Sequence, residues 1–259
     1  MTSVSQLLDP IPVIGVFALF VILSALAYEG GYRLGVARRT PTGDHAEASG
    51  LIVGALLGLM AFLLAVTMGM ASDRFDTRRG LVIDEANAIA TAYLRAGFLP
   101  EREREASRER FREYVPLQVN PGDPVQLEAN DARSDVIKAE LWRLAEEGVA
   151  SGGSSDVLAT YIESLNVVLD LEESRETALI VARVPETLVV LLFAGTLLSI
   201  GMVGYHGGLT GGRSPLSAFA MIIALAAVLA LVVDLDRPRD GFLQVSQQPL
   251  IDLQEQIAS

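Results

Sequence analysis

Four long apolar segments constrain the fold of this chain more than any other feature. They cover residues 11–28, 51–71, 184–205 and 216–235, and each is roughly as long as a helix that crosses the hydrocarbon core of a bilayer, about 20 residues. The segments form two pairs on either side of a polar insert. The sequence therefore predicts an all-α membrane protein with four transmembrane helices and a cytoplasmic helical domain inserted between spans two and three.

The composition excludes several classes of function. The net charge is −12, which argues against nucleic acid as a partner. The chain has no cysteine and only two histidines, so disulfides, thiolate chemistry and a histidine-rich metal site are excluded. We find no nucleophile–base pair, no cluster of metal ligands and no nucleotide-binding fingerprint. An enzyme is therefore not expected, and neither a catalytic residue, a metal nor a cofactor is predicted.

The distribution of arginine predicts the orientation. With four spans, both termini and the insert lie on one side of the membrane. Near the membrane that side carries seven arginines, against four on the other: Arg74, Arg78, Arg79, Arg175, Arg183, Arg237 and Arg239 against Arg33, Arg38, Arg39 and Arg213. The positive-inside rule then places the termini and the insert in the cytoplasm. We expect a first helix pair in 1–71, the insert in 72–183, a second pair in 184–235 and a cytoplasmic tail in 236–259.

The insert continues the helical pattern of the spans that flank it. Apolar residues recur at helical spacing through 72–99, so the second span is predicted to extend beyond the membrane. Turn-forming residues interrupt the pattern at 119–125 and 151–155. From Asp156 no Pro or Gly occurs before Pro185, which predicts a helix that runs into the third span with a kink at that proline.

Three stretches resemble the bacterial bestrophin-like domain family: residues 71–79, residues 84–95 and residues 236–250. The resemblance covers nearly the whole chain. It implies a homo-oligomeric channel of the bacterial inner membrane, because bestrophins are pentameric anion channels whose second membrane helix lines the pore. The clustered acidic residues of the bestrophin calcium site have no counterpart that we can assign here, so calcium activation is not implied.

The second span offers two helix faces. Its small residues Gly54, Gly58, Ala61 and Ala65 share one face, which favours close contact with another helix over a pore-lining role. The pore-lining candidates occupy a second stripe: Leu57, Met60, Leu64 and Met68. A row of apolar side chains facing an axis can gate a pore by dewetting, while plain packing or lipid contact remains the alternative.

Two polar groups follow the second span. Asp84, Asn87 and Thr91 lie on one helix face and are candidates for a polar ring around a symmetry axis. The alternative is a hydrogen-bonded network that fixes this helix against Arg78, Arg79 or the helix before Pro185. A charged collar is predicted at the membrane exit: Asp73, Arg74, Asp76, Arg78 and Arg79. These five residues could select ions, or they could anchor the helix by pairing with charges at the exit of the fourth span.

The sequence leaves the conducted ion open. Residues 72–183 contain 22 acidic and 14 basic residues, a net charge of −8 that attracts cations. The family resemblance implies anions. A non-conducting scaffold or sensor that binds a cytosolic protein is the remaining alternative. The expected partners are the lipid bilayer, further copies of the chain in a ring-like assembly and inorganic ions.

Overall fold

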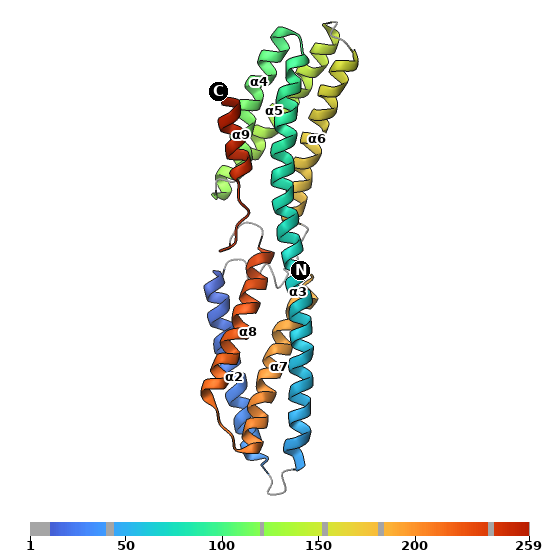
Figure 1. Cartoon of the computed structure of the whole chain (residues 1–259). Helices are drawn as coiled ribbons and strands as arrows, with labels where there is room; N and C mark the ends of the chain where they lie inside the picture. The colour runs from blue at the N-terminus through green and yellow to red at the C-terminus, as the bar shows by residue number, and fades with distance from the viewer. Residues whose placement is uncertain are drawn as a thin grey trace. The chain divides into compact units, whose positions relative to one another are not determined.

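The computed structural model describes residues 11–39, 44–119, 122–151, 155–180, 184–237 and 241–258, which form helices joined by short connections (Figure 1). No strand occurs among these residues. Four helices are long and apolar enough to cross a membrane: α2 (Val13–Ala37), α3 (Asp44–Arg95), α7 (Glu186–Thr210) and α8 (Pro215–Asp236). The predicted all-α class and the four candidate spans are confirmed. The predicted breaks at 119–125 and 151–155 fall partly outside the described residues.

The chain folds as two compact units. The span unit comprises Met1–Phe75 and Arg183–Gln244, and the helical unit comprises Asp76–Ala182 and Val245–Ser259. Helix α3 contributes to both, as expected for a span that continues beyond the membrane. The end of the chain forms α9 (Gln248–Ala258), which belongs to the helical unit. Its second residue is Pro249, a position where a missing N–H group costs no helical hydrogen bond.

Helices α2 and α7 of the span unit touch through their backbones. A Cβ atom at Gly31 would overlap the carbonyl oxygen of Gly201, and one at Gly204 would overlap that of Tyr28. Gly35 and Gly208 lie equally close to the opposite backbone. Each helix thus presents two glycines four residues apart, the pattern that allows membrane helices to approach most closely.

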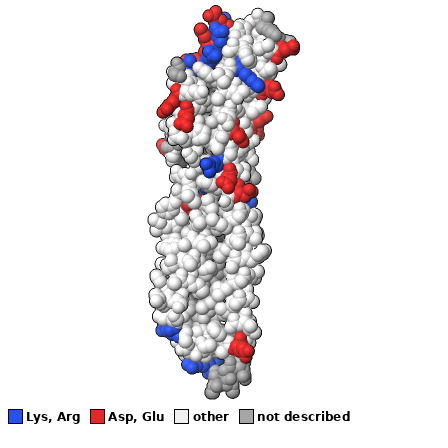
Figure 2. Space-filling view, viewed as in Figure 1, with Lys and Arg blue, Asp and Glu red and all other residues white. Residues whose placement is uncertain are grey.

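Apolar side chains fill the rest of the span unit. Phe20 of α2, Leu64 of α3, Leu192 of α7 and Leu229 of α8 form one buried cluster. Figure 2 shows that the visible surface of this unit is largely uncharged, with charged residues near the loop that joins α7 to α8. An uncharged belt of this kind suits contact with lipid.

The expected continuous helix from Asp156 through the third span is wrong. Helix α6 (Ser155–Ile180) ends before Pro185, and α7 begins at Glu186. Pro185 is the N-cap of α7, where a residue without an N–H group is tolerated. The preceding N–H, that of Val184, donates to the carboxylate of Asp236 (2.7 Å), so the break is hydrogen-bonded.

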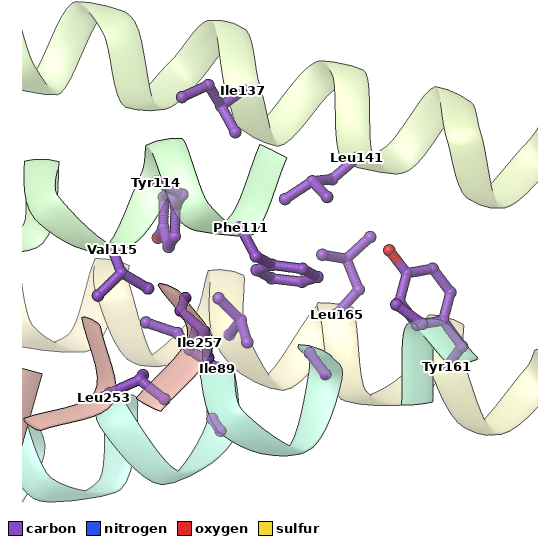
Figure 3. Close-up of a cluster of buried hydrophobic side chains, with 14 of the residues drawn as sticks. Ile89, Phe111, Tyr114, Val115, Ile137, Leu141, Tyr161, Leu165, Leu253 and Ile257 are labelled. Carbon is purple, nitrogen blue, oxygen red and sulfur yellow. The ribbon is translucent and has the colours of Figure 1, made fainter. Parts of the chain in front are cut away.

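The helical unit packs its helices around a core of large side chains. Its elements are the second part of α3, a short 3₁₀ turn (Ala96–Phe98), α4 (Glu101–Gln118), α5 (Pro124–Ala150), α6 and α9. Figure 3 shows how their side chains meet, and the residues that it labels are all buried: Ile89, Phe111, Tyr114, Val115, Ile137, Leu141, Tyr161, Leu165, Leu253 and Ile257. Helix α9 is therefore an integral part of this core.

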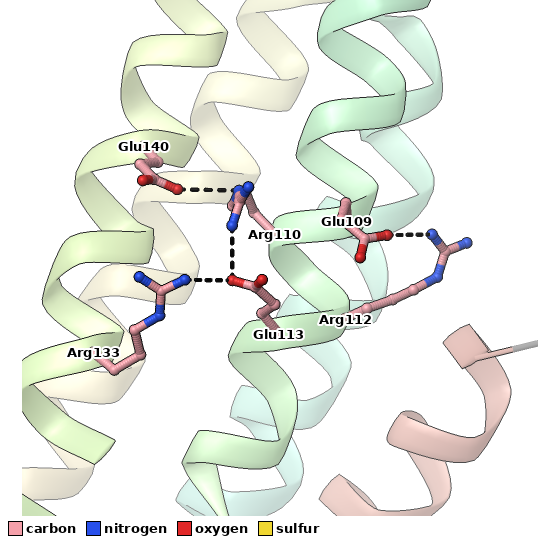
Figure 4. Close-up of polar contacts among 6 residues, drawn as sticks. All are labelled: Glu109, Arg110, Arg112, Glu113, Arg133 and Glu140. Carbon is pink, nitrogen blue, oxygen red and sulfur yellow. Dashed lines mark hydrogen bonds and ion pairs between the residues drawn. The ribbon is translucent and has the colours of Figure 1, made fainter. Parts of the chain in front are cut away.

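Ion pairs lie on the outer surface of α4 and α5 (Figure 4). Arg110 lies 2.8 Å from Glu113 and 3.0 Å from Glu140, and Arg133 lies 2.7 Å from Glu113. All four side chains remain partly exposed, so each pair contributes little to stability. The alternating charges of this segment form a solvated face.

Candidate functional site

The predicted pore-lining stripe of α3 points mainly into its own chain. Met60 and Leu64 are buried, and Leu57 and Met68 are half-buried. Leu64 packs in the cluster formed with α2, α7 and α8, and the sulfur of Met60 lies against Gly195 of α7. Within one chain, Met60 and Leu64 pack against other spans, which is the alternative to pore lining that the sequence left open. Their role in lining a pore stays a prediction.

A neighbouring face of α3 is open. Gly54, Gly58, Ala61 and Ala65 are exposed. Among the described residues nothing lies within 4 Å of a Cβ placed at Gly54 or Gly58. This face carries little side-chain volume and has no helix against it inside the described chain. Together with exposed large side chains such as Leu59 and Phe62, this face is available to a neighbouring copy or to a central path.

The five residues of the charged collar differ in exposure. Asp73, Asp76 and Arg79 are exposed, Arg74 is half-buried and Arg78 is almost fully buried. At most three of the predicted five can therefore present a complete side chain to passing ions. A buried arginine such as Arg78 serves packing and internal electrostatics.

The charged residues at the exit of α8 hold backbone groups. Asp234 accepts hydrogen bonds from the N–H groups of Phe242 and Leu243, and Arg237 donates to the carbonyl oxygen of Ile11 (2.6 Å). Together with the bond between Asp236 and Val184, these contacts join the ends of α2, α7 and α8. The motif at 236–250 thus has a structural role at its start, while Pro238, Arg239 and Asp240 lie outside the described residues.

The predicted polar ring residues line a groove of the helical unit. Asp84, Asn87 and Thr91 are exposed on α3, and they face Glu163 and Val167 of α6 across an open groove of about 400 Å³. Two carboxylates, an amide and the guanidinium of Arg95 therefore border a water-accessible surface, whose formal charge of −1 can attract hydrated cations weakly.

Two hydrogen bonds lie at the groove, one within α3 and one from α3 to α6. The hydroxyl of Thr91 donates to the carbonyl oxygen of Asn87 (2.9 Å). Arg95 donates to the carbonyl oxygen of Thr160 in α6 (2.8 Å). The network that the sequence offered as an alternative is thus present at Arg95, while Asp84 and Asn87 keep exposed side chains.

A buried polar network, which the sequence did not reveal, crosses the same unit. Arg175 of α6 lies at its centre: its Nε atom is 3.0 Å from Glu85, and its terminal nitrogens donate to the backbone and side-chain oxygens of Gln118 (2.9 and 2.6 Å). The amide of Gln118 donates to the hydroxyl of Ser134 (3.0 Å). Side chains from α3, α4, α5 and α6 are therefore tied together inside the bundle.

A second ion pair extends this network. Lys138 lies 2.8 Å from the buried carboxylate of Glu172 and 2.8 Å from Asp135. The amide of Gln118 also reaches Glu172, at 3.5 Å. These pairs raise the pKa of Lys138 although its partial burial acts in the opposite direction.

Burial raises the pKa of Glu85 to about 7, although Arg175 lowers it, and Glu172 and Glu176 add to the rise. The carboxyl group of Glu85 is fully buried, which disfavours its charged form. Burial also raises the pKa of Tyr114, which faces the same acidic groups. The network thus contains a carboxyl group that titrates close to neutral pH.

Comparison with known proteins identifies the family. A model of the bestrophin-like domain matches residues 7–250, which is almost the whole chain. The chain belongs to the bestrophin-like family. Comparison with curated proteins and with solved structures gave no significant match. The resemblance of the stretches at 71–79, 84–95 and 236–250 is thereby confirmed, and bestrophin-like membership together with the four apolar helices indicates a membrane protein.

The bestrophin-like chain shows no metal centre in its described part, where no group of three or more acidic or histidine side chains could hold an ion. Bestrophin-like membership suggests an ion channel. Two features on α3 are relevant to such a role: the open small-residue face in the span unit and the polar groove in the helical unit.

Proposed function

We propose that this bestrophin-like protein is a homo-oligomeric ion channel in which α3 lines the conducting path. One observation carries the proposal: the face of α3 at Gly54 and Gly58 has nothing against it in the described chain, while the other spans pack against a neighbouring face. A helix with one face left open is suited to surround an axis shared with other copies. A ring of five copies follows only from analogy with bestrophins.

The open face of α3 is the better candidate for the lining. The stripe with Met60 and Leu64 could reach a central path only if α3 rotated about its own axis and left the contacts with α7 and α8. Leu57 and Met68 lie at the edge of the stripe and are half-buried. We therefore assign the lining to the Gly54 face, with these two residues beside it.

Cysteine accessibility tests this assignment directly because the chain contains no cysteine. Single variants Gly58→Cys and Ala61→Cys are reconstituted in planar bilayers and treated with a charged, membrane-impermeant thiol reagent. We expect the current to fall after modification. Leu64→Cys, on the packed stripe of the same helix, is the matched control and should not respond. Modification of Leu64→Cys alone would reverse the assignment, and silent bilayers for every variant and the wild type would refute the channel.

The family implies anion conduction, whereas the charges of the chain favour cations. The rival proposal is supported by the net charge of −8 in 72–183 and by Asp84 and Glu163, which border the groove. Reversal potentials in asymmetric salt separate the two. If cations pass this groove, the double variant Asp84→Asn with Glu163→Gln shifts the reversal potential toward zero. If anions pass, the variant strengthens anion selectivity.

The orientation and the assembly are parts of the same proposal. We place the termini and the helical unit in the cytoplasm of a bacterium, at its inner membrane. Protease added to sealed inside-out vesicles should then cleave the helical unit. The mass of the detergent-solubilised particle gives the number of subunits. A stable monomer that binds one cytosolic protein stoichiometrically and carries no current would favour the scaffold instead.

A further inference from the structure

The chain turns back onto the span unit directly after α8. The carboxylate of Asp234, which is buried in the last turn of α8, accepts two backbone hydrogen bonds: from Phe242 at 2.8 Å and from Leu243 at 3.0 Å. A Cβ atom at Gly241 would lie 2.7 Å from the same carboxylate, so a larger residue there would displace the side chain of Asp234. Two large apolar side chains are therefore held beside the end of a membrane span.

Phe242 and Leu243 complete an apolar groove. Ile14 and Phe17 of α2 form one wall, Ala227 and Leu231 of α8 form the other, and the volume is about 380 Å³. Phe242 is 70% exposed and Ile14 is 64% exposed. Both carboxylate oxygens of Asp234 are occupied by backbone N–H groups, so the groove presents a nearly wholly apolar lining.

The position of the groove identifies the medium that it faces. Helices α2 and α8 contain 25 and 22 residues, and at 1.5 Å per residue each exceeds the roughly 30 Å hydrocarbon core. The first turn of α2 and the last turn of α8 therefore lie at one bilayer interface. Helix α3, whose open face we assign to the conducting path, contributes no residue to the groove.

We propose that this groove binds an acyl chain of a membrane phospholipid, and that Phe242 and Leu243 anchor the end of α8 in the bilayer interface. Aromatic side chains are favoured at that depth because their rings tolerate both headgroups and hydrocarbon. The lining offers apolar contact to a single extended chain. The inference does not depend on whether the protein conducts ions.

Tryptophan fluorescence can locate position 242 relative to the acyl chains. The only tryptophan of the chain, Trp142, lies in the helical unit, so Trp142→Phe gives a dark background. On it, Phe242→Trp is reconstituted in vesicles of phosphatidylcholine brominated on the acyl chains. We expect strong quenching, greater for bromines near the carboxyl end of the chain than for bromines near its methyl end. Leu26→Trp, exposed midway along α2, is the control for deep hydrocarbon, and Phe98→Trp, exposed on the helical unit, is the control for water.

A substitution that fills the groove distinguishes binding of an acyl chain in the groove from general contact with lipid. Ala227→Leu places a larger side chain in the groove, and Ala224→Leu adds the same volume at another exposed position of α8. Vesicles are prepared with an increasing fraction of brominated lipid mixed with unbrominated lipid. A groove that binds one acyl chain then gives a saturating quenching curve for the Phe242→Trp protein. We expect Ala227→Leu, added to that protein, to abolish the saturating part and Ala224→Leu to leave it unchanged.

Three outcomes would overturn the proposal. Quenching of Phe242→Trp that is no greater than that of Phe98→Trp would place the segment in water or beneath another protein surface. Quenching that rises in simple proportion to brominated lipid, unaffected by Ala227→Leu, would leave only general lipid contact. Asp234→Asn can accept only one of the two backbone bonds, so unchanged quenching when it is combined with Phe242→Trp would refute the role of the turn. Circular dichroism of each variant confirms that the helices have formed.

Discussion

The span unit and the helical unit are both helix bundles, yet opposite kinds of residue hold them together. In the span unit, glycines at Gly31, Gly35, Gly204 and Gly208 bring the backbones of α2 and α7 into contact. In the helical unit, large side chains fill the core and a buried ionic network crosses it. The difference follows from the solvent: lipid gives no hydrophobic drive between helices, so close approach must supply the attraction, whereas water favours burial of large apolar groups.

The largest loss of stability is expected at the contact of α2 with α7, where glycines bring the two backbones together. Gly204→Ala places a methyl group against the carbonyl oxygen of Tyr28, which cannot move without shifting a helix. We expect a loss of about 3 kcal/mol in the free energy of unfolding, the upper range for overpacking. Thermal unfolding in detergent, followed by circular dichroism, measures it.

Gly58→Ala is the matched control for that substitution, because a methyl group at Gly58 meets no described atom. Its effect on the stability of the single chain should stay below about 1 kcal/mol. Equal destabilisation by both variants would mean that glycine contact does not distinguish the two helix surfaces.

The helical unit should respond to pH through Glu85. Its pKa is raised from 4.5 to about 7 in the folded chain, so between these values the folded state binds more protons than the unfolded state. This contribution to stability is therefore present at low pH and is lost as the pH rises through 7. The full change in the free energy of unfolding is on the order of 3 kcal/mol.

Glu85→Gln removes the titrating group while keeping the shape of the side chain. The variant should show a flatter dependence of the midpoint of thermal unfolding on pH between 5 and 8, and a gain in stability relative to wild type at pH 8. Glu163→Gln, on the exposed groove of the same unit, serves as the control. A wild-type midpoint that rises over this pH interval would contradict the assignment to Glu85.

The smallest loss of stability is expected for a substitution at the surface of the helical unit. Hydrogen bonds and charge interactions with Arg133 and Arg110 lower the pKa of Glu113 despite the opposing effect of burial. The pairing therefore stabilises the fold above the unfolded pKa of the group and is lost as the pH falls through the folded pKa. Glu113→Gln should cost about 0.5 kcal/mol at neutral pH, less in high salt. Chemical denaturation at two salt concentrations checks this, and a loss as large as that of Gly204→Ala would contradict the comparison.

The sequence predicts the faces of helices better than the partners of those faces. Periodicity placed Asp84, Asn87 and Thr91 on one side of α3, where the structure has them. It offered α6, the helix before Pro185, only as one of several neighbours, because two further helices, α4 and α5, separate α6 from α3 along the chain. The same limit applies to Gly204 and Gly208, whose spacing indicates close packing but does not name α2 as the partner.

Glu85 carried a signal that periodicity could have detected. It follows Val82 by three residues and precedes Ile89 by four, which puts a carboxylate on the apolar stripe of α3. A buried acid there requires a basic partner. Arg175 is distant in sequence and looks like any other charged residue of a solvated helix, so only the fold reveals the pair. The break at Pro185 was misjudged for a related reason: the carboxylate that binds the neighbouring N–H group belongs to Asp236, which lies at the end of the fourth span.

Lys138 gives the protein a built-in chemical reporter. It is the only lysine in the sequence, and its ammonium group is held between Asp135 and Glu172 inside the helical unit. Amine-directed reagents and crosslinkers therefore have a single side-chain target, beside the α-amino group. Because the side chain is partly exposed, the rate at which it is modified measures how often its ammonium group leaves Asp135 and Glu172, without any label having been introduced.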